Sequence, residues 1–257
     1  MDDRERFVPN PSLTREEMEA LQHEIAAAAR FADDPPRDPG SVETDLVAGV
    51  DQAFLDDRTV SAIVVLRDGE IVERVWADAP LEIPYIPGLL SFREGGSILA
   101  AFEALDSDPD LVLFDGSGRI HFRQAGLATH IGVTLDRQSI GVAKNLLCGH
   151  PRESLADPLP AGGRVLIEAD DSVSAPTGTI IGAAVQTRQY DTGDRYINPV
   201  YVSPGHRVGV ETAADCVEAL CSGYKLPEPI RLADRYAGEV ADDLAADRTS
   251  DGGNSNG

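Results

Sequence analysis

The first part of the chain alternates short apolar runs with turn residues, a pattern typical of β-strands. Residues 46–54, 60–67 and 71–76 are each predicted to form a strand. Asp68-Gly69, between the second and the third of these runs, is a strong signal for a tight hairpin turn. We therefore expect three consecutive strands that pair as an antiparallel meander.

After a proline-rich loop at residues 84–88, the pattern changes to alternating helices and strands. Helices are predicted over residues 97–105, 124–133, 212–223 and 229–244. Further strands are predicted over residues 111–114, 139–143, 165–168, 179–187 and 200–203. Antiparallel strands followed by such an alternation indicate an α/β fold, with a central mixed sheet that continues as parallel strands and is flanked by helices.

The two ends of the chain differ from this central part. An amphipathic helix is predicted over residues 13–31, where Thr14 and Glu17 match a capping box. An acidic, proline-rich linker follows, and the C-terminal segment has no apolar anchor, so we expect it to be disordered. The predicted units are thus 1–44 (helix and linker), 45–246 (the main domain, which would carry the chemistry) and 247–257 (the disordered tail).

The chain is strongly acidic. Its 257 residues include 44 Asp and Glu against 22 Lys and Arg, for a net charge of −22. Such a charge should repel DNA, but the basic residues are nearly all arginines, and acid-rich, lysine-poor surfaces suit a salt-rich cytosol in which the Debye length falls to about 3 Å near 1 M. An ordinary acidic protein is the alternative. Residues 116–150 are locally basic, which is typical of a phosphate-binding face or of a solvated surface.

The cysteines and the lack of membrane signals favour a cytoplasmic protein. Cys148, Cys216 and Cys221 form no CxxC pair and have no histidine at zinc-binding spacing, so we expect reduced thiols. Neither a signal peptide nor an apolar run of membrane-spanning length is present. We expect no membrane contact and no obligate protein partner.

Three acidic residues stand where predicted strands end or a helix begins. Asp51 lies in the first strand, Asp115 ends the strand at 111–114, and Glu94 follows the proline-rich loop. An Asp in a sheet is unfavourable unless something binds it, and carboxylate oxygens are ligands that Mg²⁺ accepts. We predict that these residues hold a divalent metal ion. For Glu94, the alternative is a first-turn residue that favours the helix dipole.

Lys144 and His206 complete the candidate chemistry. Lys144 is one of only two lysines in the chain, and its ammonium group could lie against a phosphate or could be a solvated strand end. His206 follows a predicted strand, and a lone histidine is more often structural than catalytic. A catalytic role for His206 therefore depends on the sequence motif in which it stands, PVYVSPGH at residues 199–206.

Five phrases, in this order along the chain, resemble one family. They are AGVDQAF at 48–54, PYIPGLLSFRE at 84–94, LVLFDGSG at 111–118, VAK at 142–144 and PVYVSPGH at 199–206. Together they resemble endonuclease V, a family of nucleases directed at deaminated bases such as inosine. The likeness runs from about Asp45 to Tyr236, and the acidic composition suggests that the chain comes from a halophilic archaeon.

The resemblance implies a ribonuclease H-like fold and a Mg²⁺ cofactor, for which Mn²⁺ could substitute. It implies the catalytic residues Asp51, Glu94, Asp115, Lys144 and His206, with the three carboxylates as metal ligands. It also implies a wedge and a pocket for the flipped-out base, formed by Tyr85, Pro87, Gly88, Leu90, Gly116, His121, Gly126 and Leu127.

Two segments depart from the pattern of the family. Its usual His-Pro-Arg is His121-Phe122-Arg123 here, which puts the shape of the pocket wall in doubt. The phrase Lys225–Asp234 matches near the C-terminus with Lys in place of the usual Arg, and we interpret it as a structural clamp on the last helix.

The resemblance implies a DNA repair enzyme that makes one nick, at the second phosphodiester bond 3′ to a deaminated base, and leaves 3′-hydroxyl and 5′-phosphate ends. Inosine in RNA is an alternative substrate. A nuclease of the same fold with another specificity, like the nuclease domain of nucleotide-excision incision proteins, is a second alternative. A nucleic-acid-binding module that has lost catalysis is a third, against which the presence of all three carboxylates argues.

Overall fold

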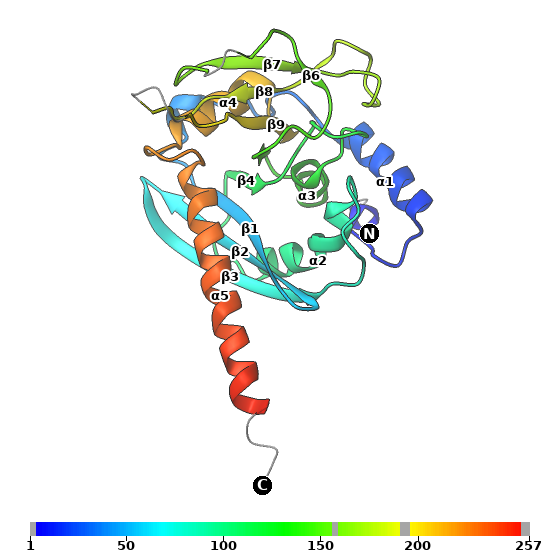
Figure 1. Ribbon diagram of the computed structural model, residues 1–257, viewed down its shortest axis with the longest axis vertical. Helices are drawn as coiled ribbons and strands as arrows, with labels where there is room; N and C mark the ends of the chain where they lie inside the picture. The colour runs from blue at the N-terminus through cyan, green and yellow to red at the C-terminus, as the bar shows by residue number, and fades with distance from the viewer. Residues whose placement is uncertain (1–3, 156–158, 191–195, 253–257) are drawn as a thin grey trace.

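The computed structural model describes residues 4–155, 159–190 and 196–252, and in these residues the centre of the fold is one nine-stranded sheet with helices on both faces (Figure 1). Across the sheet the strands follow the order β3-β2-β1-β4-β5-β9-β8-β7-β6. The strands are β1 (Val47–Leu55), β2 (Arg58–Arg67), β3 (Glu70–Pro80), β4 (Leu111–Asp115), β5 (Ser139–Ala143), β6 (His150–Pro151), β7 (Arg164–Glu168), β8 (Ile180–Val185) and β9 (Val200–His206).

The helices of the described residues cover the sheet and its flanks. They are α1 (Arg15–Ala28), α2 (Leu90–Glu103), α3 (Leu127–Leu135), α4 (Val210–Ala219) and α5 (Glu228–Gly252), with short 3-10 turns at Glu5–Phe7 and Pro39–Ser41. None of these helices is long and apolar enough to cross a membrane. The predicted α/β, ribonuclease H-like fold is confirmed.

Strand pairing confirms the predicted meander and corrects part of the second half. Strands β1, β2 and β3 pair antiparallel, and β4 and β5 run parallel to β1. The strands from β6 to β9 are antiparallel to their neighbours rather than parallel. The reason is that no helix of the described residues lies between β7 and β8 or between β8 and β9, whereas a parallel connection needs a crossover.

Several helix boundaries differ from the expected ones. Helix α2 begins seven residues early, at Leu90 instead of residue 97, although Gly95 and Gly96 disfavour a helix. Gly95 is needed there because a Cβ would lie 2.5 Å from Pro9 of the N-terminal segment. Helix α3 begins only at Leu127, because Gln124 has a positive φ of 55°.

The helices near both ends of the chain also differ in their bounds from the predicted ones. The predicted capping box of Thr14 and Glu17 is present, and α1 runs from Arg15 to Ala28 instead of over residues 13–31. Helix α5 continues to Gly252, six residues into the segment that was expected to be disordered. Residues 253–257 lie outside the described part of the chain.

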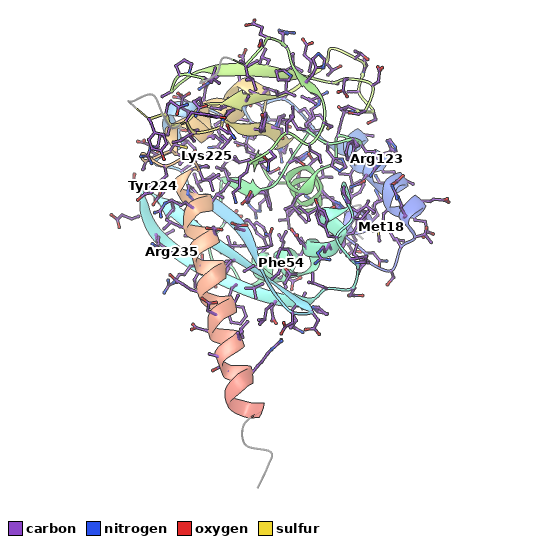
Figure 2. The ribbon with its side chains drawn as sticks, viewed as in Figure 1. Met18, Phe54, Arg123, Tyr224, Lys225 and Arg235 are labelled. Carbon is purple, nitrogen blue, oxygen red and sulfur yellow. The ribbon has the colours of Figure 1, made fainter. Side chains whose placement is uncertain are left out.

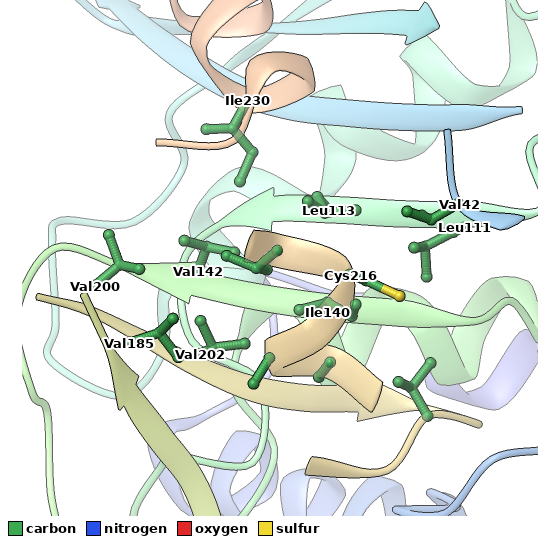
Figure 3. Close-up of a cluster of buried hydrophobic side chains, with 14 of the residues drawn as sticks. Val42, Leu111, Leu113, Ile140, Val142, Val185, Val200, Val202, Cys216 and Ile230 are labelled. Carbon is green, nitrogen blue, oxygen red and sulfur yellow. The ribbon is translucent and has the colours of Figure 1, made fainter. Parts of the chain in front are cut away.

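Alternation along β1 divides its side chains between two cores, one on each face of the sheet. Val47 joins a cluster with Leu111, Leu113 and residues of α4 and α5 (Figure 3). Ala48 and Val50 join the opposite cluster, which α2 and α3 cover. The three cysteines are free, as predicted; Cys216 is buried in the first of these cores, and Cys148 is buried in a separate cluster.

Candidate active site

Strand pairing brings Asp51 and Asp115 together. The parallel register of β1 and β4 pairs Val50 with Phe114, so the next residue on each strand is one of the two acids. In a parallel pair, residues in register point to the same face, and Val50 and Phe114 both enter the core under α2 and α3. Asp51 and Asp115 therefore point to the opposite face, where α5 lies.

Asp51 is a buried carboxyl in an unfavourable environment. It is 7% exposed, and its Oδ1 accepts a hydrogen bond from the backbone N–H of Gln52 at 2.7 Å. Burial, followed by the charges of Asp115 and Asp234, raises the pKa of Asp51 to about 8. A nearby cation would relieve this penalty, because it favours the ionised carboxylate.

Glu94 belongs to α2, on the other face of the sheet, and its charge interacts with that of Asp115. It lies in the second turn of the helix, where the fields of the first-turn N–H groups have decayed, so the first-turn alternative is wrong. Glu94 is 3% exposed, and burial raises its pKa to about 7, with Arg93 opposing the shift and Asp115 adding to it. Asp51 and Glu94, two of the three predicted metal ligands, are thus both buried carboxyls whose pKa values are raised.

Lys144 provides a positive charge beside the carboxyls. It follows β5, and its Nζ lies 2.7 Å from Oδ2 of Asp115. Burial lowers the pKa of Lys144, but the hydrogen bond and charge of Asp115 raise it by more, so the pKa is raised overall. Burial and then the charge of Lys144 lower the pKa of Lys225, which precedes α5 (Figure 2). The only two lysines of the chain therefore lie near each other.

The structure does not bring His206 to this site. Strand β9 runs antiparallel to β5, so Tyr201 pairs with Ala143 beside Lys144, whereas His206 pairs with Ser139 at the far end of β5. Four residues of strand, roughly 13 Å, separate the two ends. In this structure His206 therefore lies away from Asp51, Asp115 and Lys144, and its predicted catalytic role stays a prediction. The sequence could not show this separation, because a strand pattern carries no information about strand direction.

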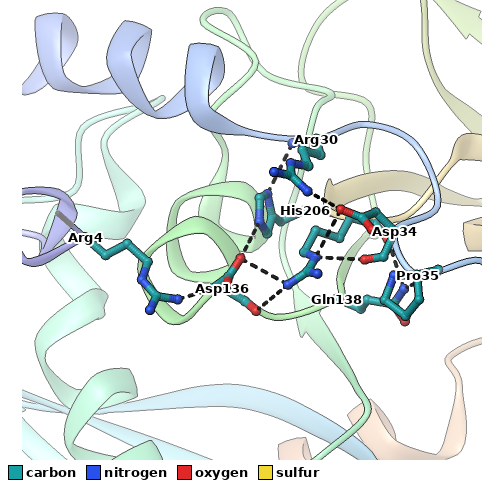
Figure 4. Close-up of polar contacts among 8 residues, drawn as sticks. Arg4, Arg30, Asp34, Pro35, Asp136, Gln138 and His206 are labelled. Carbon is teal, nitrogen blue, oxygen red and sulfur yellow. Dashed lines mark hydrogen bonds and ion pairs between the residues drawn. The ribbon is translucent and has the colours of Figure 1, made fainter. Parts of the chain in front are cut away.

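His206 instead joins a network of paired polar groups (Figure 4). Its Nδ1 accepts from the backbone N–H of Arg30 at 3.2 Å, and its Nε2 lies 3.3 Å from Oδ1 of Asp136. Asp136 also contacts Arg4 at 3.0 Å and Arg207 at 3.2 Å. Burial lowers the pKa of His206, so the ring is a neutral link in a structural network.

Asp234 of α5 lies close enough for its charge to act on the site, although its phrase is interpreted above as a structural clamp. The start of α5 is pressed onto β1 so closely that a Cβ on Gly49 would lie 2.1 Å from the backbone of Pro229. Ile230 is buried in the core against β4, and Asp234 follows one helical turn later on the same side. The charge of Asp234 acts on both Asp51 and Lys144. The sequence offers one signal for this position: Asp234 lies four residues after the apolar Ile230, so in a helix the two residues share a face.

A pocket opens beside Asp115 and Lys144. Its volume is about 230 Å³. Six of the eight residues predicted for substrate binding line it, namely Tyr85, Gly88, Leu90, His121, Gly126 and Leu127. Pro87 and Gly116 do not line it: Gly116 faces Leu127, whose Cδ2 would lie 3.2 Å from an added Cβ. Tyr85 is 65% exposed at the rim.

His121 shapes this pocket as a neutral ring. It is 2% exposed, its Nε2 donates to the carbonyl of Gly88 at 3.0 Å, and its Nδ1 accepts from the backbone N–H of Arg123 at 3.2 Å. Burial lowers the pKa of His121 to about 4. Phe122, the departure from the family pattern, packs against another core cluster, which includes Ile120 and Ile167.

The donor set of the site suits a hard cation, although it is not a preformed cage. Asp51, Glu94, Asp115 and Asp234 offer only carboxylate oxygens, the ligands of Mg²⁺ and Mn²⁺. Among the described residues, no three acidic, histidine or cysteine side chains converge into a ready-made metal site. Asp115 is engaged by Lys144 in this structure. Burial nevertheless raises the pKa values of Asp51 and Glu94 although Lys144 and Arg93 oppose the shifts, so a cation bound beside these carboxyls would relieve the remaining penalty.

Comparisons with known proteins extend the likeness over nearly the whole chain. The family model described as Endonuclease V matches residues 27–235. Endonuclease V of the halophilic archaeon Haloarcula marismortui is 61% identical over 260 residues, covering 92% of this chain and 96% of that protein. The crystal structure of endonuclease V from Streptomyces avermitilis is 34% identical with a TM-score of 0.77, covering 90% of this chain and 95% of the other.

A further similar structure contains a ligand. Endonuclease V of Ciona intestinalis, in complex with a 24mer DNA containing an inosine followed by a ribo-adenosine, is 24% identical to this chain. It has a TM-score of 0.74 and covers 89% of this chain and 98% of its own. At this identity the likeness concerns the fold.

Proposed function

This chain belongs to the endonuclease V family and is a nuclease, and we propose that it uses a divalent metal ion to nick DNA strands at deaminated bases, deoxyinosine above all. The observation that carries the proposal is that one cavity joins both parts of such a site. The pocket suited to a base is lined by Asp115 and Lys144 as well as by Tyr85 at its rim. Two residues proposed for cleavage, Asp115 and Lys144, therefore line the same cavity as residues proposed for base recognition.

We assign the metal ion to the carboxylates of Asp51, Glu94, Asp115 and Asp234, and Mg²⁺ is the ion proposed, with Mn²⁺ as a substitute. When bound, such an ion stabilises negative charge on the phosphoryl group and makes water a better nucleophile. The raised pKa values of Asp51 and Glu94 support this assignment, because burial disfavours their ionised forms and a bound cation would offset that penalty.

The chain itself contributes charge and orientation around the phosphate. Lys144 is half exposed and already held 2.7 Å from Asp115, so its ammonium group lies where a phosphate would approach the carboxylates. A positioned ammonium stabilises the negative charge that develops on the phosphoryl oxygens. Lys225 adds positive charge nearby.

The pocket supports a flipped-out purine as the recognised group. Gly126 is followed by the first turn of α3, and a Cβ at this position would lie 2.4 Å from the carbonyl of Ser117, so the wall is built from closely packed backbone. Tyr85 offers an exposed ring for stacking, which is worth about 1–3 kcal/mol per base. The inosine in the Ciona complex is consistent with this pocket.

A nicking assay tests the proposal. A 5′-labelled DNA strand with one deoxyinosine is incubated with the protein and Mg²⁺, beside an identical strand with guanine and a reaction that contains EDTA. We expect one product, cut at the second phosphodiester bond 3′ to the deoxyinosine and ending in a 3′-hydroxyl, and none with EDTA. Equal cutting of the guanine strand would contradict the assignment.

A matched RNA strand with one inosine decides between the two nucleic acids. We propose DNA as the main substrate, so the DNA strand should be cut faster than the RNA strand under the same conditions. Faster cutting of RNA would make the chain an inosine-directed endoribonuclease.

A further inference from the structure

Gln22 is a buried polar side chain that enters the base pocket from outside the matched region. It belongs to α1, before residue 27 where the family match begins, and it is 1% exposed. It lines the same pocket as Tyr85 and Asp115. In Figure 2, Met18 marks α1 and Arg123 marks the loop against which this helix packs.

Every polar atom of the Gln22 amide has a partner. Its Nε2 donates to the carbonyl of Gly88 at 2.8 Å and to the carbonyl of Ala125 at 3.3 Å. Its Oε1 accepts from Nε of Arg123 at 2.7 Å. The two carbonyls accept and Arg123 donates, so these partners fix which amide atom is nitrogen and which is oxygen.

These contacts join two walls of the pocket that are far apart in the sequence. Gly88 ends the loop that carries Tyr85, whereas Ala125 directly precedes Gly126 and α3. Gly88 has a φ of +82°, a conformation that favours glycine, and its carbonyl also accepts a hydrogen bond from His121. One amide therefore sets the distance between the Tyr85 loop and the opposite wall.

The energetic consequence of losing this amide is local. Gly88 and Ala125 are both buried, so without Gln22 the carbonyl of Ala125 would lose its side-chain donor, and that of Gly88 would retain only His121. Buried acceptors without partners are unfavourable, and loops relieve this by moving toward water. Such a movement would widen the pocket, whereas Asp51, Asp115 and Lys144 are held by the sheet.

We propose that Gln22 is a positioning residue for specificity: it holds the two walls of the base pocket at the spacing that discriminates a deaminated base from an ordinary one. This inference rests on the proposed function. Gln22 acts through Gly88 and Ala125 and takes no part in cleavage itself.

Gln22→Met tests the inference, because methionine has a similar length and no hydrogen-bonding hydrogen. Binding of a deoxyinosine strand and of a matched guanine strand is measured in EDTA, which withholds the metal ion proposed for cleavage, and cleavage is measured in single turnover with saturating enzyme and Mg²⁺. We expect the preference for the deoxyinosine strand to fall by about tenfold, from the loss of one to two hydrogen bonds. The single-turnover rate should stay within about threefold of wild type.

Two variants of the same helix serve as controls. Glu24→Ala changes an exposed residue and should leave both measurements unchanged. Thr14→Ala removes the N-cap of α1 and weakens the helix without touching the pocket, so it should lower the melting temperature while the preference is retained. If Gln22→Met does not fold, Gln22→Asn retains an amide that is too short to reach both carbonyls and should show the same loss in weaker form.

Several outcomes would overturn the inference. An unchanged preference in Gln22→Met or Gln22→Asn would do so, as would equal weakening of both strands, or a preference lost equally in Thr14→Ala. If wild-type protein shows no preference for deoxyinosine, the proposed function fails instead, and the two failures are thus distinguishable.

Discussion

The two ends of strand β5 present the same kinds of side chains in opposite electrostatic states. At one end, Asp136 and His206 form a network in which the acid contacts arginines and the imidazole is hydrogen-bonded on both nitrogens. At the other end, Asp51 and Glu94 are buried, and their pKa values are raised to about 8 and about 7. Paired groups stabilise a fold, whereas acids whose pKa values burial raises despite nearby positive charges indicate a candidate site for a cation.

The comparison also separates two histidines that the sequence does not distinguish by chemistry. His206 ties the segment after α1 to the far end of the sheet. His121, equally buried, holds the Gly88 carbonyl at the rim of the pocket. Position in the fold, rather than residue type, decides which of them bears on the substrate.

Replacing an acid at the end of β5 beside Lys144 should have the largest effect. We expect Asp51→Asn and Asp115→Asn each to lower the single-turnover nicking rate by about 10²-fold or more, since each loses a metal-ligand charge. Binding of the deoxyinosine strand should change little, because the pocket is intact. Asp136→Asn, in the network of His206 at the other end of β5, is the matched control and should nick at close to the wild-type rate. More than about a tenth of the wild-type rate in Asp51→Asn would remove this residue from the metal site.

Asp234→Asn tests whether α5 contributes a ligand to the proposed metal site. We expect the rate to fall by about tenfold to 10²-fold, with a higher Mg²⁺ concentration needed for half-maximal rate, because the ligand set loses one charge. Titration of Mg²⁺ in the nicking assay measures this. Glu239→Gln, an exposed acid further along the same helix, is the control. An unchanged Mg²⁺ dependence would return Asp234 to a structural role.

His206→Ala should affect stability rather than chemistry. The substitution leaves the backbone N–H of Arg30 without its imidazole acceptor, which should cost about 1–3 kcal/mol of unfolding free energy. The single-turnover rate of the folded variant should stay within about threefold of wild type. Chemical denaturation and the nicking assay measure the two quantities. A rate loss comparable to that of Asp51→Asn would reinstate His206 as catalytic.

The smallest effect is a pH dependence of stability in the metal-free protein. Asp51 and Glu94 keep their protons to a higher pH when folded than when unfolded, where their pKa values are 3.8 and 4.5. Their contribution is therefore fully present below about pH 4 and is lost as pH rises toward about 8. Between pH 6 and 8 in EDTA, we expect this contribution to lower the melting temperature by on the order of 5 °C relative to Asp51→Asn. Added Mg²⁺ should remove the difference. Parallel melting curves for the two proteins would contradict the raised pKa.

The sequence by itself determined the elements and most of the chemistry. Alternating apolar residues and Asp68-Gly69 predicted the β1–β3 meander, because a hairpin turn and strand periodicity are local properties. The family phrases located Asp51, Asp115 and Lys144, which the register of β1, β4 and β5 brings side by side.

Only the tertiary structure decided which distant residues join them. Strand periodicity gives the face on which a side chain lies but not the direction of the strand, so only the structure shows that His206 lies at the end of β5 away from Lys144. Asp234 reaches the site because α5 packs directly on Gly49, and Gln22 reaches the pocket because α1 packs against the Arg123 loop. Docking of one element on another depends on the packing of the whole core, which no local pattern contains.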